Sequence, residues 1–323
     1  MEGRTLVTWG DRLVRQRLPD GAARVLRGPG IVFAEGGCLL DVDGDGRLDI
    51  VVNESPPEAA LVWFRAPQAG GGWTRHVIDT GVEAADMLAA TLLGRRGVLL
   101  IHMGAQVRFY SIPAVPVGRW PSQDVYSFYS PSRQGGLHMA DIDGDGRPDV
   151  VAGMYWIRSP ESFELPWRLF AITLWNQTPE SAMLRSRYGP LTGSAAELVA
   201  VQRAMTPARL ARFERPADPR HLWVEHRIES PPDLAAVNSL EVADFDGNGR
   251  PDILLAENGG AGRLIVLRNE GAGRFSSVVI SQGKPVRFAH AVDVNGDGRP
   301  DILVIGTNAI TWWENRGGQE THP

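Results

Sequence analysis

A nine-residue acidic motif occurs four times in this chain, and no other feature restricts its fold as strongly. The copies are DVDGDGRLD at 41–49, DIDGDGRPD at 141–149, DFDGNGRPD at 244–252 and DVNGDGRPD at 293–301. Their starts are 100, 103 and 49 residues apart, which indicates a repeat of about 50 residues with two copies missing. An apolar, β-prone run flanks each copy on both sides, so each motif is expected to be the loop of a β-hairpin.

A second repeat has the same period and marks a later strand of each unit. Its copies begin at Trp73, Trp120, Trp167, Trp223 and Phe275, and they include the two units that lack the acidic motif. A third strand lies between the two repeats, as in LVWFR at 61–65 and ITWWE at 310–314. Four short strands in about 40–50 residues is the size of one propeller blade.

The sequence therefore predicts an all-β fold, a six-bladed β-propeller with four-stranded blades, with seven blades as the alternative. A single domain is expected over residues 1–323, with a polar tail at 319–323. The last unit lacks a fourth strand, and residues 11–18 carry the missing pattern. We expect this N-terminal strand to pair with residues 310–314, because that pairing closes the ring and removes an exposed sheet edge. AATLLGRRG at 89–97 and GPLTGSAAE at 189–197 are expected to replace the acidic loop in blades two and four.

The acidic motif has the spacing of an oxygen cage for a metal ion. Glycines at positions 4 and 6 allow a tight turn, and carboxylates at positions 1, 3, 5 and 9 can then converge. Oxygen donors without nitrogen or sulfur favour calcium, with up to four ions. The expected side-chain ligands are Asp41, Asp43, Asp45, Asp49, Asp141, Asp143, Asp145, Asp149, Asp244, Asp246, Asn248, Asp252, Asp293, Asn295, Asp297 and Asp301, and the expected carbonyl ligands are Arg47, Arg147, Arg250 and Arg299. The loops at 41 and 141 have one more carboxylate than the other two, so we expect them to bind calcium more tightly.

This motif, followed by an apolar strand and repeated at about 50 residues, resembles the FG-GAP or VCBS repeat family. Members of that family include the integrin α-chain head and form calcium-binding β-propellers. The resemblance implies calcium loops on one face and an extracellular or periplasmic location, although MEGRTLVTWG at the start has no secretory signal pattern. It does not imply one activity, because fold and function separate in propellers.

Polar side chains recur on the innermost strands, three residues before the first aspartate of the motif. His138, Glu241 and His290 stand there, with Cys38 in one blade and Asp86 in the matching place of blade two. The end of the second strand adds Glu54, His102 and Glu257, and the loop SFYSPSRQGG adds Tyr129 and Arg133. Residues at one register of the innermost strands converge on the propeller axis, so a ligand pocket is expected there. His76 and His226 repeat on outer strands and are expected to be structural.

Two interpretations of this axial ring remain open. It is either a polar channel that binds a ligand, or a histidine and carboxylate set for a transition metal or for acid–base chemistry. The leading function is accordingly a calcium-stabilised binding module for glycans or a protein partner. The alternative is a metal-dependent sugar lyase or dehydratase with its site on the axis.

Other classes of function lack support in the sequence. The formal net charge of −5 and the absence of a long basic run argue against nucleic acid. No stretch of 18 apolar residues predicts insertion into a membrane. Cys38 is the only cysteine, which excludes an intramolecular disulfide and a zinc site built on thiolates. No nucleophile elbow, P-loop, dinucleotide fingerprint or HExxH motif is present.

Overall fold

The computed structural model describes residues 5–9, 12–18, 21, 24–27, 32–57, 59–68, 71–128, 135–175, 184–193, 195–203, 205–306 and 310–317. Every regular element within these ranges is a β-strand. None of the described segments forms a helix with the length and apolar character needed to cross a bilayer. The chain divides into two compact units, Met1–Phe170 and Ala171–Pro323.

The first unit contains four antiparallel sheets, each made from strands that are consecutive in the sequence. They are β1 (Thr5–Trp9), β2 (Leu13–Arg17) and β3 (Arg24–Arg27); β4 (Phe33–Leu40), β5 (Asp49–Glu54), β6 (Ala60–Arg65) and β7 (Thr74–Thr80); β8 (Ala84–Leu92), β9 (Arg95–His102), β10 (Gln106–Ser111) and β11 (Ser122–Ser127); and β12 (Leu137–Ala140), β13 (Asp149–Ala152), β14 (Tyr155–Arg158) and β15 (Arg168–Ala171). β15 ends one residue inside the second unit.

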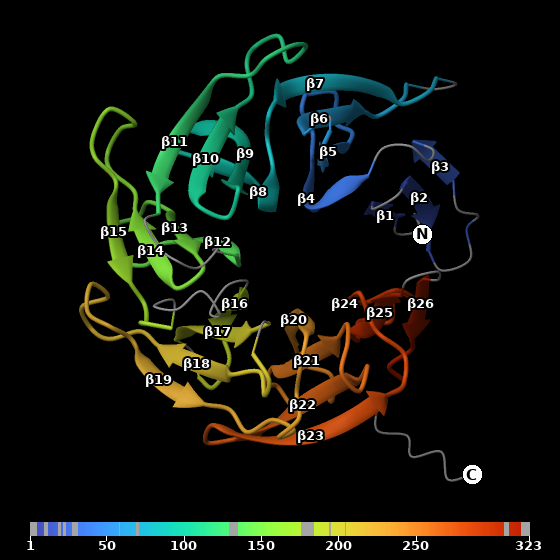
Figure 1. The fold of residues 1–323 in the computed structure, drawn as a ribbon, viewed down its shortest axis with the longest axis vertical. Coiled ribbons are helices and arrows are strands. Elements are labelled where there is room, and N and C mark those ends of the chain that lie inside the picture. The colour runs from blue at the N-terminus through green and yellow to red at the C-terminus, as the bar shows by residue number, and fades with distance from the viewer. Residues whose placement is uncertain are drawn as a thin grey trace. The chain divides into compact units, whose positions relative to one another are not determined.

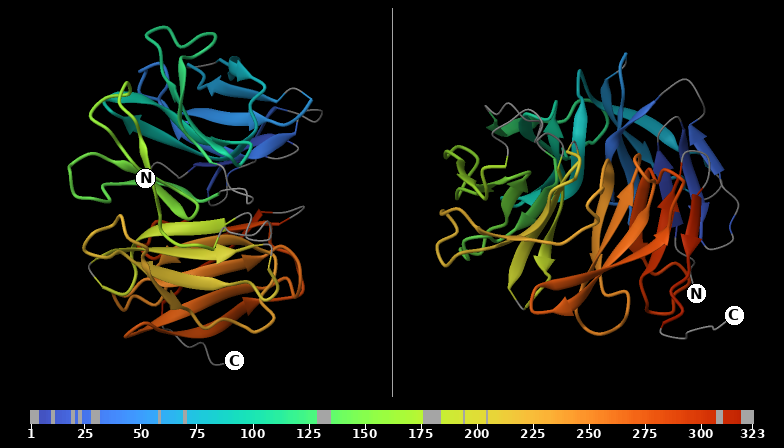
Figure 2. Two further views of the ribbon diagram at one scale, coloured as in Figure 1. Left: turned by 60° about the vertical axis from the view of Figure 1, so that its left-hand side comes forward. Right: turned by 60° about the horizontal axis from the view of Figure 1, so that its bottom comes forward.

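The second unit contains three further sheets of the same kind (Figures 1 and 2). They are β16 (Leu184–Pro190), β17 (Ala196–Gln202), β18 (Leu210–Glu214) and β19 (Val224–Arg227); β20 (Val237–Ala243), β21 (Asp252–Glu257), β22 (Leu264–Gly271) and β23 (Arg274–Ser281); and β24 (Phe288–Val292), β25 (Asp301–Ile305) and β26 (Ile310–Trp313).

These seven sheets are the blades of a seven-bladed β-propeller. The expected count of six is therefore wrong, and the seven-bladed alternative is confirmed. The difference arises at the N-terminus, where β2 pairs with β1 and β3 and not with β26. TLVTW and RVLR lie directly before and after β2 and pair with it locally, which costs far less loop-closure entropy than pairing with a strand near the end of the chain. The described part of the expected strand, residues 12–18, thus lies in a blade with β1 and β3.

The second strand of a blade is buried on both faces, which explains why it reads as a continuous apolar run. Val51 packs into a cluster shared with the β8–β11 sheet, whereas Ile50 and Val52 pack into a cluster shared with the first sheet. Leu254 and Leu255 divide between two clusters in the same way in the second unit. A strand enclosed by sheets on both sides has no face left for polar residues.

The two replacements of the acidic loop are both hairpins, as expected. β8 and β9 are joined by only two residues, Leu93 and Gly94, whose φ values are 47° and 76°. Positive φ at both central residues is the geometry of a type I′ turn, which suits the twist of paired strands. β16 and β17 are joined by residues 191–195. These blades therefore form their first hairpin without the acidic motif.

Candidate functional site

All four acidic loops share one backbone hydrogen-bond scheme. The first aspartate of each loop accepts hydrogen bonds from the backbone N–H groups of positions 4, 5 and 6. For Asp41 the donors are Gly44 (2.8 Å), Asp45 (3.1 Å) and Gly46 (2.9 Å). The loops that begin at Asp141, Asp244 and Asp293 repeat these bonds. Gly44 and Gly46 have φ of 75° and 83°, a conformation that costs glycine little.

The last aspartate of each loop ties the loop to the end of the third strand. Asp49 accepts the N–H of Val42 with one oxygen (3.0 Å) and the N–H of Ala66 with the other (2.6 Å). Asp149, Asp252 and Asp301 repeat the scheme with Ile142 and Ser159, Phe245 and Asn269, and Val294 and Asn315. All four carboxylates are fully buried. Sequence reasoning assigned these residues as ligands only and missed this structural role, which their invariant position could have indicated.

Burial raises the pKa of Asp49, Asp149 and Asp252 above the ordinary carboxyl range. The pKa of Asp149 reaches about 6, and the pKa values of Asp49 and Asp252 are also raised. Desolvation is the main cause, and hydrogen bonds from backbone N–H groups offset it in part. A nearby cation would favour the ionised form of each group.

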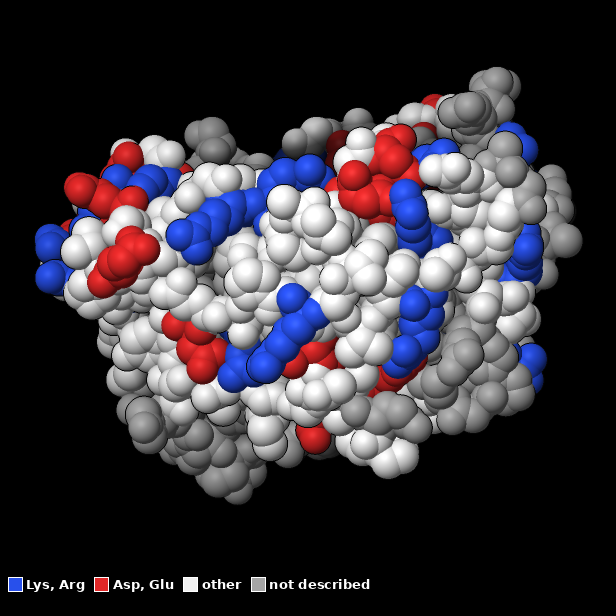
Figure 3. Space-filling model, turned by 90° about the horizontal axis from the view of Figure 1, so that it is seen from above, with Lys and Arg blue, Asp and Glu red and all other residues white. Residues whose placement is uncertain are grey.

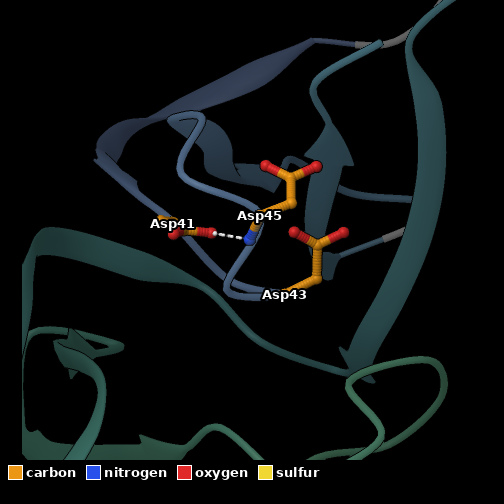
Figure 4. A group of neighbouring side chains, drawn as sticks. All are labelled: Asp41, Asp43 and Asp45. Atoms are coloured by element: carbon orange, nitrogen blue, oxygen red, sulfur yellow. Dashed lines mark hydrogen bonds between the residues drawn. The ribbon is translucent and has the colours of Figure 1, made fainter. Parts of the chain in front are cut away.

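Three of the loops bring carboxylates together as a cation site requires. In each set one oxygen per residue lies within 4.8 Å of the others: Asp41, Asp43 and Asp45; Asp141, Asp143 and Asp149; and Asp244, Asp246 and Asp252. Figure 4 shows the first set. Asp43 Oδ1 is buried there and accepts no hydrogen bond from the part of the chain that the structure describes. An oxygen-only donor set with such an orphaned acceptor fits a hard cation.

The other predicted ligands occupy the same loops in related roles. Asp145 accepts the N–H of Arg147 (3.0 Å), Asn248 that of Arg250 (2.8 Å), and Asp297 that of Arg299 (2.9 Å). The same contact joins Asp45 and Arg47 (3.0 Å). Asn295 donates to Asp297 at 3.1 Å. Each of these contacts tightens the second half of its loop.

Strand register shows which residues share the innermost position predicted for the ligand pocket. His138, Glu241 and His290 pair with Val151, Leu254 and Leu303, and Cys38 pairs with Val51. The assignment of Asp86 to this position is wrong. His76, three residues after Trp73, pairs through Trp63 and Val51 with Cys38. Gln123, three residues after Trp120, is connected in the same way through Phe109 and Leu99 to Leu88. In β16 the position belongs to Arg187, which lines up through Val199 and Arg212 with His226. Only the strand register identifies Arg187, because this blade lacks the acidic motif from which the position is counted in the sequence.

Three of these innermost residues form one cluster in the second unit. Glu241 on β20 accepts two hydrogen bonds from Arg187 on β16, at 2.9 and 2.7 Å. His290 Nδ1 on β24 lies 3.0 Å from Glu241 Oε1. Burial alone would raise the pKa of Glu241, but the hydrogen bonds from His290 and Arg187 outweigh burial and lower it. Glu241 is thus an ionised carboxylate shared by two side chains that remain 39% and 45% exposed, those of Arg187 and His290.

The corresponding residues of the first unit have structural contacts. The Asp86 carboxylate accepts the N–H groups of Gly136 and Leu137 at 3.0 and 2.9 Å, and so links β8 to the start of β12. His138 follows directly on β12 and is half-buried. These two residues lie in Met1–Phe170, whereas Glu241 and His290 lie in Ala171–Pro323.

The residues predicted at the ends of the second strands are buried and hydrogen-bonded. Glu54 accepts two hydrogen bonds from Arg75, at 2.8 and 2.5 Å. His102 Nδ1 accepts the N–H of Glu83 at 3.2 Å, and burial lowers the pKa of His102. Glu257 is bound by Arg263. Tyr129 and Arg133 lie outside the described residues.

The repeated tryptophans are packing residues, as are the outer histidines. Trp63, Trp120, Trp156 and Trp223 are all buried. His76 stacks on Trp63 with ring centroids 4.6 Å apart. His226 Nε2 lies 3.0 Å from Glu214 on an exposed outer strand. On the face seen in Figure 3, basic and acidic side chains are interspersed, with no large field of one sign.

Comparison with known proteins supports the fold more than any one activity. Residues 244–304 match the model of the FG-GAP-like repeat family. No curated protein sequence matches the chain. YCF48 from Cyanidioschyzon merolae is 10% identical, with a TM-score of 0.59 over 97% of this chain and 92% of that one. A putative 6-phosphogluconolactonase from Bacteroides fragilis is 15% identical, with a TM-score of 0.59 over 97% and 91%. A structure of YCF48 bound to D1 peptide is 14% identical, with a TM-score of 0.53 over 95% and 86%. At these identities the likeness concerns the fold alone.

Proposed function

From the premise that this chain is an FG-GAP repeat β-propeller, we propose that it is a calcium-stabilised binding module for a protein partner. The observation that carries the proposal is the cluster of Arg187, Glu241 and His290 on three adjacent innermost strands. It offers a cation, a carboxylate and an imidazole side by side, which suits recognition of a polar or charged peptide group. We place its action outside the cytoplasm, where calcium is abundant.

Calcium is proposed for all four acidic loops. Asp41, Asp43 and Asp45 would hold one ion, and the equivalent residues would hold the others. The orphaned oxygen of Asp43 and the oxygen-only donor sets support this choice. The ion supplies positive charge to side chains that would otherwise repel each other. The loop residues then fix each hairpin through the backbone bonds made by their first and last aspartates.

A protein partner is favoured over a glycan by the aromatic residues. Sugar sites stack pyranose rings on exposed aromatic faces, but four of the repeated tryptophans are buried and three, Trp73, Trp167 and Trp312, are half-buried. Among the described aromatic side chains, Trp313 is the strongly exposed one, at 46%. A propeller of similar fold, YCF48, has been solved bound to a peptide. Fold likeness is only supporting context here, because such low identity transfers no ligand.

The binding proposal is tested with the variant His290→Ala. A phage-displayed library of random peptides and a glycan array are screened against the wild type, and the hits are re-measured with the variant. We expect peptide hits whose binding is lost in His290→Ala while the melting temperature stays unchanged. The matched control is His226→Ala on the outer strand β19, which removes a histidine–glutamate contact of the same kind, that of His226 with Glu214. Glycan hits alone, or peptide hits indifferent to His290, would overturn the proposal.

One observation favours a second candidate, a metal-dependent lyase or dehydratase. Glu241 accepts a hydrogen bond from the Nδ1–H of His290, so that in the neutral imidazole the Nε2 lone pair is available for proton transfer or for a transition metal. Elemental analysis of the purified protein separates the candidates. Calcium at up to four equivalents without another metal agrees with the binding module. A further equivalent of zinc or manganese that is lost in His290→Ala would favour the enzyme.

A further inference from the structure

We propose that in three blades the residue that ends or directly follows the third strand sets how strongly the acidic loop of that blade binds calcium. Arg65 and Arg158 act as built-in cations that oppose calcium at two loops, whereas Glu314 is an additional calcium ligand at the loop 293–301. This inference rests on the calcium binding proposed above.

Strand register shows that these residues occupy one structural position. Trp63, Trp156 and Trp312 pair with Val51, Val151 and Leu303, which share one register in their blades. Arg65, Arg158 and Glu314 each lie two residues beyond these tryptophans. Arg268 takes the position in β22, two residues beyond Val266. These four residues therefore share one place in their blades, next to the acidic loop, and the side chain that stands there differs from blade to blade.

In two blades this side chain is an arginine that contacts the loop carboxylates. Arg65 Nε lies 2.5 Å from Asp43 Oδ2. Arg158 contacts Asp143 and also lies 3.0 Å from Asp145 Oδ2. Both arginines thus reach the carboxylate at loop position 3, which is a predicted calcium ligand. A guanidinium there neutralises charge that would otherwise attract the ion.

In the last blade the same contact joins a neutral loop residue to a negatively charged residue after the strand. Loop position 3 is the neutral Asn295, and its Nδ2 lies 3.4 Å from Glu314 Oε1. Arg316 donates to the other oxygen of Glu314 at 2.9 Å. The Arg316 side chain is 71% exposed, so solvent screens this ion pair more than those of Arg65 and Arg158 and leaves more of the Glu314 charge for calcium. The loop that lost one carboxylate from its sequence thus regains one from the neighbouring strand. Asn295 and Glu314 both offer an oxygen ligand at this contact. The corresponding contact at the loops 41–49 and 141–149 consists of one carboxylate paired with an arginine.

The expected order of affinities changes as a result. The carboxylate count of the loops alone favours calcium at 41–49 and 141–149. Calcium prefers six to eight oxygen ligands and additional negative charge, so Glu314 strengthens the loop at 293–301. At the loops 41–49 and 141–149 calcium must compete with Arg65 or Arg158 for the carboxylate at loop position 3. The loop at 293–301 is therefore expected to bind calcium more tightly than its own carboxylate count predicts.

The test compares Arg65→Met, Arg158→Met and Glu314→Gln in the full chain. Calcium affinities are measured by titration calorimetry after chelation, and melting temperatures are measured in chelator and in excess calcium. Each arginine variant should gain affinity several-fold at one site and lose stability in chelator. Glu314→Gln should lose about tenfold in affinity at one site. The controls are Arg268→Met, which has the same strand position but no ion pair to its loop among the described residues, and Glu270→Gln on β22.

The outcomes separate this inference from the proposal that supports it. A wild type that binds calcium, with affinities unchanged in all three variants, overturns the inference and leaves the calcium proposal standing. A wild type that binds no calcium overturns both the proposal and the ligand role of Glu314. In that case the chelator measurement still decides the role of the arginines, because a built-in cation predicts lower stability in Arg65→Met than in Arg268→Met.

Discussion

Glu257 shows how a polar residue of the innermost region can serve the fold. It is fully buried at the end of β21, and its two oxygens accept four hydrogen bonds. Arg263 donates three of them, from its backbone N–H at 3.1 Å and from Nε and Nη2 at 2.8 Å each. Ala235 donates the fourth at 3.0 Å. The sequence predicted a ligand-pocket residue here, and the structure gives it a complete set of internal partners.

Replacing Glu257 by glutamine should therefore destabilise the protein strongly. The change leaves the Arg263 charge, whose side chain is only 9% exposed, without its buried counter-ion. Breaking a buried pair in this way costs about 3–5 kcal/mol. Urea unfolding measures the loss. Asp233→Asn is the control, because it removes the exposed second partner of Arg263 and should cost far less. Equal losses in the two variants would contradict this account.

The same residue predicts a dependence of stability on pH. Burial alone would raise the pKa of Glu257, but hydrogen bonds from Arg263 outweigh burial and hold it below its ordinary value of 4.5. The folded state then binds fewer protons than the unfolded state, so this contribution is fully present above pH 4.5 and is lost as the pH falls through the folded pKa. The difference in unfolding free energy between wild type and Glu257→Gln should be largest above pH 4.5 and should shrink as the pH falls below that value. A difference that stays constant would refute the assignment.

At the scale of elements, the β8–β9 hairpin replaces a calcium loop with backbone geometry alone. Leu93 and Gly94 hold positive φ, and a Cβ added to Gly94 would meet no atom within 4 Å. Gly94→Ala should therefore cost only the strain of the left-handed conformation, about 1–2 kcal/mol, and the cost should be equal in calcium and in chelator. Gly72→Ala is the control, because Gly72 also has open space but no positive φ. Thermal unfolding of both variants in the two buffers checks the prediction. It fails if the cost depends on calcium.

At the scale of the whole molecule, each compact unit carries two of the four acidic loops. The loops at 41 and 141 belong to Met1–Phe170, and those at 244 and 293 belong to Ala171–Pro323. If calcium fills them, chelation should lower the stability of both units. Each site contributes about 2.7 kcal/mol when free calcium is 100 times its dissociation constant. Scanning calorimetry should show the whole transition moving down in chelator and returning with excess calcium. An unchanged transition in a protein shown to lack calcium would remove the ion from the account.

The sequence by itself determined the features that depend on nearby residues. Turn chemistry and local periodicity predict the acidic loops, the apolar strands beside them and the two replacement hairpins. Both depend only on residues that are close in the sequence. Burial on both faces made the second strands readable as apolar runs. The repetition of the tryptophans indicates that they share one environment in their blades, and Trp63, Trp120, Trp156 and Trp223 are all buried.

Only the tertiary structure decided which strands pair and which side chains meet across blades. The N-terminal strand β2 had a suitable pattern for the last blade, but it pairs with its sequence neighbours β1 and β3, and the three strands form a seventh blade. Register across β8 and β16 moved the innermost position from Asp86 to Leu88 and revealed Arg187 beside Glu241. The contacts of Arg65 and Glu314 with their loops likewise join residues of different strands. Such contacts depend on register, and a shift of one residue turns a side chain to the opposite face without changing the local pattern.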